Sequence, residues 1–280
     1  MIPIETLRTE AFSMQYFRFG TGSRVMVIIP GLSLKSVMLS AEQIAAAYAV
    51  FAADYTVYVF DRRADLPDAY TAPDAAEDTA AAMRALHLTQ AYIFGASQGG
   101  MIALCIAAKH PELVSRVAVG STAAKLPDGA EKQLRDWIRM AKYGFTTALT
   151  LLFSQACYSE ALFLASREPL LKMAASVTDE DMARFLILAR GSAGLDLLPL
   201  LDAIRCPVLA IGGAKDRILG AEPTRELAER LHCGCYIYPE GAHAVYDEAP
   251  DYKDRLYAFF QQQLFGSGTR SAGNGTAPHA

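Results

Sequence analysis

One stretch of the chain limits its fold more than any other: residues 91–100, Ala-Tyr-Ile-Phe-Gly-Ala-Ser-Gln-Gly-Gly. An apolar run ends there in Gly-x-Ser-x-Gly, and a run rich in alanine and isoleucine follows at once, over residues 101–109. This order predicts a strand, a sharp turn and a helix, with Ser97 at the apex of the turn. Gly95 and Gly99 leave room for neighbouring backbone, and Ser97 itself is expected to adopt a strained conformation. Such a turn lifts a hydroxyl above a sheet, at the N-terminus of a helix.

Apolar runs alternate with helical patterns on both sides of this turn. Strands are predicted at 24–29, 55–60, 91–95, 114–120, 207–212 and 235–238, and helices at 40–51, 74–88, 223–231 and 252–265. Continuous apolar strands separated by helices are typical of a parallel sheet that is covered on both faces. Residues 11–19 and 24–29, joined by Gly20-Thr21-Gly22, are predicted to open the sheet as a hairpin. The predicted fold class is therefore α/β, with a doubly wound, mostly parallel sheet.

The alternation stops between residues 123 and 201, where aromatic residues recur at helical spacing and no convincing strand is found. Helices are predicted there at 131–143, 147–156, 159–166, 169–176 and 179–190. We therefore expect a core made of residues 1–122 and 202–265, with an all-helical cap inserted at 123–201. Residues 266–280 are small, polar and rich in Gly, Ser and Thr, and we expect them to form a disordered tail.

The ends of the predicted strands indicate where a site should lie. Right-handed crossovers bring the loops that begin at Pro30, Asp61, Ser97 and Ser121 to one edge of the sheet, around a common crevice. A serine hydroxyl becomes a good nucleophile only when a base removes its proton and a third group orients that base. His243 follows the strand 235–238 in a glycine-flanked loop, whereas the other histidines end helices or lie in the tail. His243 is therefore the predicted base.

Asp216 is the predicted acid, because it follows the strand 207–211 in a loop whose preceding glycines allow the chain to bend back toward the histidine. Two other acids compete with it. Asp61 precedes the serine, and Asp61-Arg62-Arg63 is expected to form a structural ion pair. Glu240 shares the loop of His243 and is expected to be solvated.

An oxyanion that forms at Ser97 also needs two backbone N–H donors. Gln98, the first residue of the helix after the serine, is expected to supply one. Leu32, in the loop that follows the strand 24–29, is expected to supply the other. The alternative for Pro30-Gly31 is that it only terminates that strand.

At this point the chain resembles the α/β-hydrolase superfamily over residues 12–265, in the subgroup with a helical cap inserted after the sixth strand. The resemblance rests on Pro30-Gly31-Leu32, Gly95-Ala96-Ser97-Gln98-Gly99-Gly100, residues 207–216 and Gly241-Ala242-His243. It implies a catalytic triad of Ser97, Asp216 and His243, with an oxyanion hole formed by the Leu32 and Gln98 amides.

The chain departs from this superfamily at two positions. Most relatives have His-Gly where this chain has Pro30-Gly31, which puts the geometry of the loop and the substrate preference in doubt. The residue after the serine is often Met in relatives and is Gln98 here, which adds a polar group near the pocket.

Charge, apolar runs and cysteine usage limit which kinds of molecule the chain is expected to bind and where in the cell it is expected to be. The net charge of −4 comes without a basic stripe, so nucleic acid is not expected to bind. No apolar run approaches the roughly 18 residues that span a bilayer. The N-terminus lacks the order of a signal peptide, and the five scattered cysteines fit reduced thiols, so a cytoplasmic location is expected. Cys233-Gly234-Cys235 has no second cluster beside it, so neither a metal nor another cofactor is expected.

These features predict a serine hydrolase that cleaves a small to medium ester-type substrate, a small molecule, through an acyl-enzyme. Carbon–carbon bond hydrolysis, thioester or lactone hydrolysis, acyl transfer to an alcohol and perhydrolysis are alternatives on the same triad. A ligand receptor or scaffold on a hydrolase fold is an alternative of another class, and the presence of both Ser97 and His243 favours an enzyme. The substrate and the oligomeric state stay open.

Overall fold

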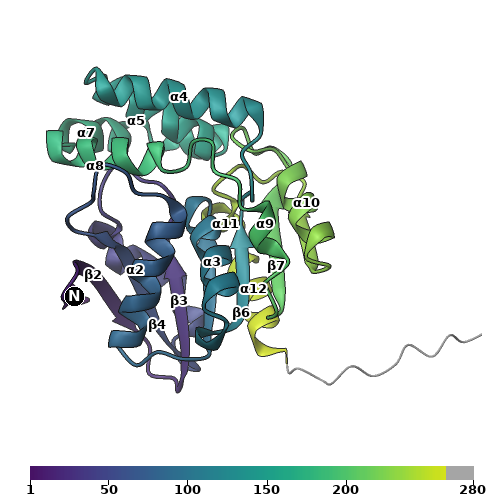
Figure 1. The fold of residues 1–280 in the computed structure, drawn as a ribbon. Coiled ribbons are helices and arrows are strands. Elements are labelled where there is room, and N and C mark those ends of the chain that lie inside the picture. Colours follow the sequence, from purple (N-terminus) through teal and green to yellow (C-terminus); the bar gives the residue numbers. More distant parts are fainter. Residues whose placement is uncertain (263–280) are drawn as a thin grey trace, which may run out of the picture.

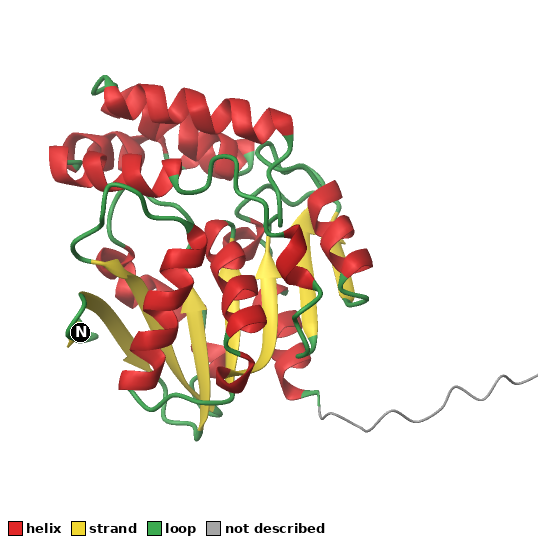
Figure 2. Cartoon of the chain, viewed as in Figure 1, coloured by secondary structure: helices red, strands yellow, loops and turns green. Residues whose placement is uncertain are grey.

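The computed structural model of the protein describes residues 1–262, which form an eight-stranded sheet with helices on both faces (Figures 1 and 2). The strand order is β1-β2-β4-β3-β5-β6-β7-β8, and every pairing from β4 to β8 is parallel. The strands are β1 (Glu5–Arg8), β2 (Ser13–Phe19), β3 (Arg24–Ile29), β4 (Tyr55–Arg63), β5 (Ala91–Ala96), β6 (Val114–Gly120), β7 (Val208–Gly213) and β8 (Gly234–Tyr238). The predicted fold class is confirmed. The predicted tail at 266–280 lies outside the described residues.

The hairpin predicted from residues 11–19 and 24–29 is wrong. β2 pairs antiparallel with β4, and its hairpin partner is β1, which the sequence pattern did not predict. β3 instead lies between β4 and β5 and runs parallel to both. The last four residues of β3 are buried, whereas β2 exposes Gln15 and Arg18. A strand that is apolar on both faces belongs in the covered interior of the sheet, and a strand with exposed polar residues belongs near its edge.

Two groups of helices sandwich the sheet. One face carries α2 (Ala72–Ala85), α3 (Gln98–Lys109), α9 (Leu198–Leu201) and α10 (Glu222–Arg230), and the other carries α1 (Ala41–Ala47), α11 (Val245–Glu248) and α12 (Tyr252–Gln261). The helix predicted at 74–88 begins earlier, because Thr71 and Asp74 exchange side-chain and backbone hydrogen bonds as a capping box. Within residues 1–262 no helix has the length and apolarity to cross a membrane.

A helical insertion, which we define as α4–α8, separates β6 from β7 and lies over the carboxyl ends of the parallel strands (Figure 1). Its longer helices agree with the prediction to within three residues at each end: α4 (Asp128–Lys142), α5 (Thr146–Cys157), α6 (Glu160–Ala165), α7 (Arg167–Ser176) and α8 (Asp179–Arg190). Its own core contains Trp137, Phe153 and Phe185 in edge-to-face contacts. Leu34 from the β3–α1 loop packs into that core, so the insertion is tied to the sheet domain by apolar contact as well as by covalent bonds.

The chain enters and leaves the insertion at one place. Lys125 and Asp196 form an isolated antiparallel bridge, and their side chains make an ion pair at 3.1 Å. Next to it, the N–H of Leu197 donates to the carbonyl of Ala124 at 2.8 Å. The two connecting segments therefore run side by side into the sheet domain.

The space around two glycines leads us to expect opposite effects on stability when each is replaced by alanine. A Cβ on Gly213, at the end of β7, would lie 2.1 Å from the carbonyl oxygen of Gly241, whereas a Cβ on Gly129, in α4, meets nothing within 4 Å. Gly213→Ala should lower the free energy of unfolding by about 1–3 kcal/mol through overpacking. Gly129→Ala should raise it by up to about 1 kcal/mol, since alanine favours helix. Urea unfolding of both variants measures the difference, and equal effects would contradict the packing described here.

Candidate active site

Ser97 joins β5 to α3 with a left-handed backbone conformation, φ 52° and ψ −120°. This conformation is unfavourable for a residue with a side chain, so the surrounding structure has to hold it. The N–H of Ser97 donates to the carbonyl of Gly120 at the end of β6, at 2.8 Å. The hydroxyl of Thr122 donates to the carbonyl of Ser97, at 2.7 Å. Both bonds come from the neighbouring strand and its loop, and they fix the strained turn.

The glycines on either side of Ser97 allow close backbone contact. A Cβ on Gly95 would lie 2.3 Å from the carbonyl oxygen of Gly99, and one on Gly99 would lie 2.0 Å from that of Ile29 at the end of β3. Side chains at either position would push α3 away from the sheet. The turn therefore needs both glycines in order to bring the serine to the edge of the sheet.

His243 lies between Ser97 and Asp216. Its Nε2 is 2.9 Å from the Ser97 Oγ, and its Nδ1 is 2.8 Å from the Asp216 Oδ2. The other carboxylate oxygen, Oδ1, accepts from the backbone N–H groups of Ile218 (2.8 Å) and Leu219 (2.9 Å). The side chains of His243 and Asp216 are 3% and 1% exposed, so this pair is shielded from water. The structure thus brings together the three residues that the sequence predicted.

The loops that carry Asp216 and His243 are bonded to each other. They follow β7 and β8, which are adjacent in the sheet. The N–H of Lys215 donates to the carbonyl of Gly241, and that of Ala214 to the carbonyl of Tyr238, each at 2.9 Å. Because the two loops continue the pairing of their strands, the aspartate and the histidine are held at a fixed separation.

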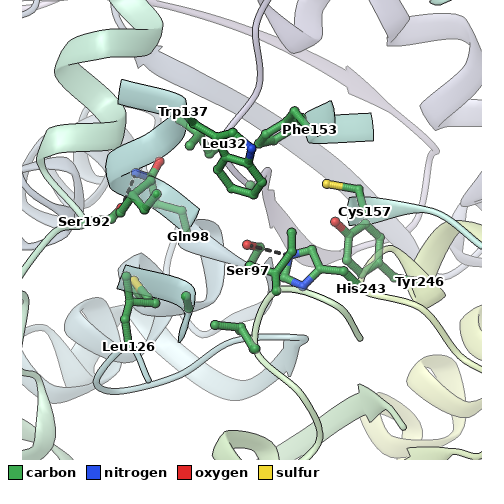
Figure 3. Close-up of a pocket in the computed structure, with 16 residues that line it drawn as sticks. Leu32, Ser97, Gln98, Leu126, Trp137, Phe153, Cys157, Ser192, His243 and Tyr246 are labelled. Carbon is green, nitrogen blue, oxygen red and sulfur yellow. Dashed lines mark hydrogen bonds between the residues drawn. The ribbon is translucent and has the colours of Figure 1, made fainter. Parts of the chain in front are cut away.

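The predicted oxyanion residues also reach Ser97. A Cβ on Gly31 would lie 3.2 Å from the Cβ of Ser97, so the loop after β3 runs directly over the serine. Leu32 and Gln98 line the same pocket as Ser97 (Figure 3). Within residues 1–262, the backbone N–H groups of Leu32 and Gln98 have no hydrogen-bond acceptor. An oxyanion that forms at a serine is stabilised by two backbone N–H donors, and these two N–H groups are free to serve as such donors.

The pocket above Ser97 is small, with a volume of about 70 Å³. Side chains from the sheet domain and from the helical insertion both line it (Figure 3). The lining is mainly apolar and includes Met101, Leu126, Leu134, Trp137, Phe153, Ile218 and Leu219. Polar groups are few, and they gather around the serine. An apolar hollow with a small number of placed polar groups is typical of a site for a small molecule.

The two competing acids lie elsewhere. Asp61 forms an ion pair, but its partner is Arg184 of α8, at 2.9 Å, and it also accepts from the Ser36 hydroxyl at 2.5 Å. It therefore ties the sheet domain to the insertion. Glu240 is exposed and pairs with Lys215. Within the described residues, neither carboxylate makes a hydrogen bond to His243.

Comparison with known proteins decides the family. The model of the family described as the alpha/beta hydrolase fold matches residues 24–250. The chain belongs to the α/β-hydrolase family.

Individual relatives agree with this assignment. The chain is 25% identical over 255 residues to 3-oxoadipate enol-lactonase 2 of Acinetobacter baylyi, which covers 88% of this chain and 92% of the relative. It is 25% identical over 260 residues to the serine hydrolase BPHL of Mus musculus. This alignment covers 89% of this chain and 83% of the relative. The crystal structure of MGS-M2, an alpha/beta hydrolase from a deep-sea metagenome library, superimposes with a TM-score of 0.84 at 22% identity, over 94% of this chain and 99% of that one. These relatives are hydrolases, and this α/β-hydrolase is therefore a hydrolytic enzyme.

The structure shows how this α/β-hydrolase holds the loop that contains Pro30. The guanidinium of Arg62, at the end of β4, donates through Nη2 to the carbonyl of Pro30 at 2.7 Å. The same Nη2 lies 3.3 Å from the Gln98 Oε1. Arg62 is 5% exposed, no carboxylate pairs with it among residues 1–262, and burial lowers its pKa. Sequence reasoning missed Arg62, although an arginine directly after a buried apolar strand was a signal.

Gln98 extends this contact to the helical insertion. Its Nε2 donates to the carbonyl of Leu188, in the last turn of α8, at 2.8 Å. The same Nε2 donates to the hydroxyl of Ser192, just after α8, at 2.8 Å (Figure 3). A chain of hydrogen bonds therefore runs from the loop at Pro30, through Arg62 and Gln98, to the insertion. The residue next to the serine is the anchor of the helices that cover it.

These hydrogen bonds of Gln98 predict that two substitutions lower the stability of the protein to different extents. Gln98→Met removes the donor and leaves two buried acceptors without partners, so it should lower the free energy of unfolding by about 1–3 kcal/mol. Ser192→Ala removes one acceptor and leaves Leu188 paired, so its effect should be smaller, about 0.5–1.5 kcal/mol. Urea unfolding of the two variants measures the order, and a larger loss for Ser192→Ala would refute the anchoring role of Gln98.

Proposed function

We propose that this enzyme is a serine hydrolase that cleaves small to medium ester-type substrates through an acyl-enzyme. The observation that carries the proposal is the line of contacts from the Ser97 Oγ to His243 at 2.9 Å and on to Asp216 at 2.8 Å. A hydroxyl, an imidazole and a buried carboxylate in this order are the arrangement that activates a serine. The name of the murine relative, serine hydrolase BPHL, supports the same chemistry.

The first half of the reaction transfers the acyl group to the enzyme. With Nδ1 protonated and donating to Asp216, His243 accepts the Ser97 proton at Nε2 while Oγ attacks the substrate carbonyl. The N–H groups of Leu32 and Gln98 donate to the oxyanion that forms. The imidazolium then protonates the leaving alkoxide, the carbon–oxygen bond breaks, and the alcohol departs.

The second half returns the enzyme to its starting state. Water takes the place of the alcohol, and His243 removes its proton as it attacks the acyl carbon. A second oxyanion forms at the same N–H groups, and its collapse releases the acid and restores the Ser97 hydroxyl. The apolar pocket favours a small to medium apolar group on the substrate. The helical insertion serves as a cap that covers the reacting groups.

Lactone hydrolysis is the second candidate function. The bacterial relative named enol-lactonase motivates it, and a solved structure with the same kind of title, from Burkholderia xenovorans, superimposes with a TM-score of 0.80. A lactone is a cyclic ester, so the same residues act in the same roles. The alcohol then stays attached to the acyl group until water releases both.

Labelling and turnover together test the serine. Wild-type protein should release 4-nitrophenol from 4-nitrophenyl acetate and butyrate with an initial burst, and a fluorophosphonate should add once, as measured by intact mass. Ser97→Ala should lose the label, and Ser97→Ala and His243→Ala should lose turnover by about 10³-fold or more. Ser121→Ala is the matched control, because that serine directly follows the neighbouring strand β6 and its buried hydroxyl has no hydrogen-bond partner in residues 1–262.

The outcomes separate the classes of function. If the Ser97→Ala variant retained turnover, Ser97 would be excluded as the nucleophile. Labelling of Ser97 without turnover of any ester or lactone would favour carbon–carbon bond hydrolysis or a binding role.

The role of the acid predicts a catalytic loss without unfolding. In Asp216→Asn the amide oxygen keeps the two backbone N–H groups, and the NH₂ group then faces Nδ1, which forces the imidazole into the wrong tautomer. The value of kcat should fall by about 10⁴-fold, as for the same change in serine proteases. Glu240→Gln, an exposed change in the loop of His243, should leave kcat unchanged. Steady-state kinetics and thermal melts of both variants check this, and an active Asp216→Asn enzyme would exclude Asp216 as the orienting acid.

A further inference from the structure

A second hollow adjoins the pocket of Ser97, and we call it the groove. It lies between residues 30–44 and helices α5 and α7 of the insertion, and it has a volume of about 730 Å³. The pocket itself has a volume of about 70 Å³, whereas sites that enclose a small molecule usually hold roughly 300–1,000 Å³. The pocket is therefore too small for a complete ester of more than a few carbon atoms, and the rest of such a substrate has to lie outside it.

The pocket has little freedom to widen. Leu134 and Trp137, which form part of its lining, are each 5% exposed and belong to the core of the insertion. Trp137 also packs edge-to-face on Phe153, with the ring centroids 4.9 Å apart. A close-packed core resists a change of volume, because the neighbouring side chains would have to leave their preferred rotamers. One side of a substrate bound at Ser97 is therefore limited to a small group.

The groove reaches the immediate neighbours of Ser97. Ala96, the residue before the serine, lines the groove, and so does Gly31, on which a Cβ would lie 3.2 Å from the Cβ of Ser97. The groove and the pocket also share Leu32 and three side chains that Figure 3 shows to the right of Ser97, namely Phe153, Cys157 and Tyr246. Because the two hollows adjoin beside the reacting hydroxyl, one molecule can occupy both.

The lining of the groove is mainly apolar. Its floor contains residues from the carboxyl ends of β3, β4 and β5, one wall comes from residues 30–44, and the opposite wall comes from α5 and α7. The apolar side chains of the two walls include Leu34, Val37, Ile44, Phe153, Leu170 and Met173. An apolar chain that lies between these walls removes their surface and its own from water, which is favourable.

The charged residues of the groove do not select a charged ligand. Both signs are present, since Lys35, Lys172 and Asp247 all belong to the lining. Lys172 and Asp247 are exposed to water, and Lys35 is paired with Asp181 at 3.1 Å. The occupant that the lining favours is therefore an uncharged apolar chain.

We propose that the groove binds an extended apolar chain of the substrate, while the small pocket receives a short group on the other side of the same ester. The enzyme then prefers esters that are long on one side of the ester group and short on the other. This assignment rests on the proposed function, because it places the ester carbonyl at Ser97. Each methylene group that the groove removes from water should raise kcat/KM by about two- to fourfold.

Three isomeric esters test this asymmetry in the full chain. Heptyl acetate, methyl octanoate and butyl pentanoate differ in the position of the ester group and hardly in their total apolar surface. One of the two asymmetric esters places three more methylene groups in the groove than butyl pentanoate does, so its kcat/KM should be higher by about 10-fold or more. Acid release at constant pH measures the rates.

The outcome also identifies the chain that lies in the groove. A preference for heptyl acetate assigns the groove to the alcohol chain, and a preference for methyl octanoate assigns it to the acyl chain. If kcat/KM for butyl pentanoate equalled or exceeded that of both other esters, the proposal would be overturned.

Two substitutions on α7 give a matched pair. Met173→Trp fills part of the groove, so it should lower kcat/KM for the preferred asymmetric ester by about 10-fold and leave that for methyl acetate within about twofold. Leu171→Trp adds the same side chain at a position that is 41% exposed and does not line the groove, so it should leave both values unchanged. If Met173→Trp does not fold, Ile44→Trp fills the groove from the opposite wall. An equal loss for both esters, or no loss for either, would count against the groove.

Binding of unreactive ketones separates a failure of the groove from a failure of the serine mechanism. Nonan-2-one has one long chain and a methyl group on its carbonyl, whereas its isomer nonan-5-one has two equal chains. Titration calorimetry with Ser97→Ala should show that nonan-2-one binds about 10-fold more tightly, and addition of Met173→Trp should abolish the difference. This preference together with a lack of ester turnover in the wild type would refute the serine mechanism alone. Equal binding of the two ketones would refute the proposed role of the groove, whatever the turnover.

Discussion

The left-handed backbone of Ser97 is the constraint on which the rest of the site depends. A serine in this conformation is stable only where neighbouring backbone holds it, and here β3, β6 and α3 all approach the turn closely. Gly95 and Gly99 permit that approach, and Thr122 completes it with a hydrogen bond. The order of strands in the sheet is thus tied to the exposure of one hydroxyl. A different strand beside β5 would leave the turn without its supporting contacts.

Arg62 shows a second constraint, which is electrostatic. Burial of a guanidinium without a carboxylate is unfavourable. In this chain the Nη2 of Arg62 donates to the loop over Ser97 and lies within reach of Gln98, whereas its Nε is buried without a partner among residues 1–262. It thereby fixes the two segments that supply the proposed oxyanion donors. The loop is thus supported by an arginine from the next strand of the chain.

The sequence predicted the parts of the structure that depend on local pattern and chain order. The parallel strands, the insertion and the residues Ser97, Asp216 and His243 follow from apolar runs, helical spacing and the order of loops along one sheet edge. Lateral pairing is a long-range property, so the hairpin assigned to β2 and β3 was wrong. Arg62 was missed for a related reason. It owes its surroundings to segments far away in the chain, and no short motif marks an arginine of this kind.

Lys125 and Asp196 pair where the chain enters and leaves the insertion, and this pairing has a consequence for the evolution of the molecule. The two connecting segments are paired with each other as neighbouring strands would be. The insertion is therefore joined to the sheet domain in the same way as one long hairpin loop. Exchange of α4–α8 for another helical segment leaves the ends of β6 and β7 in place. The ceiling of the pocket, with Trp137 and Phe153, can thus diverge separately from its floor, where the serine and the histidine lie. One scaffold can in this way keep its reaction and acquire new substrates by replacing a single module.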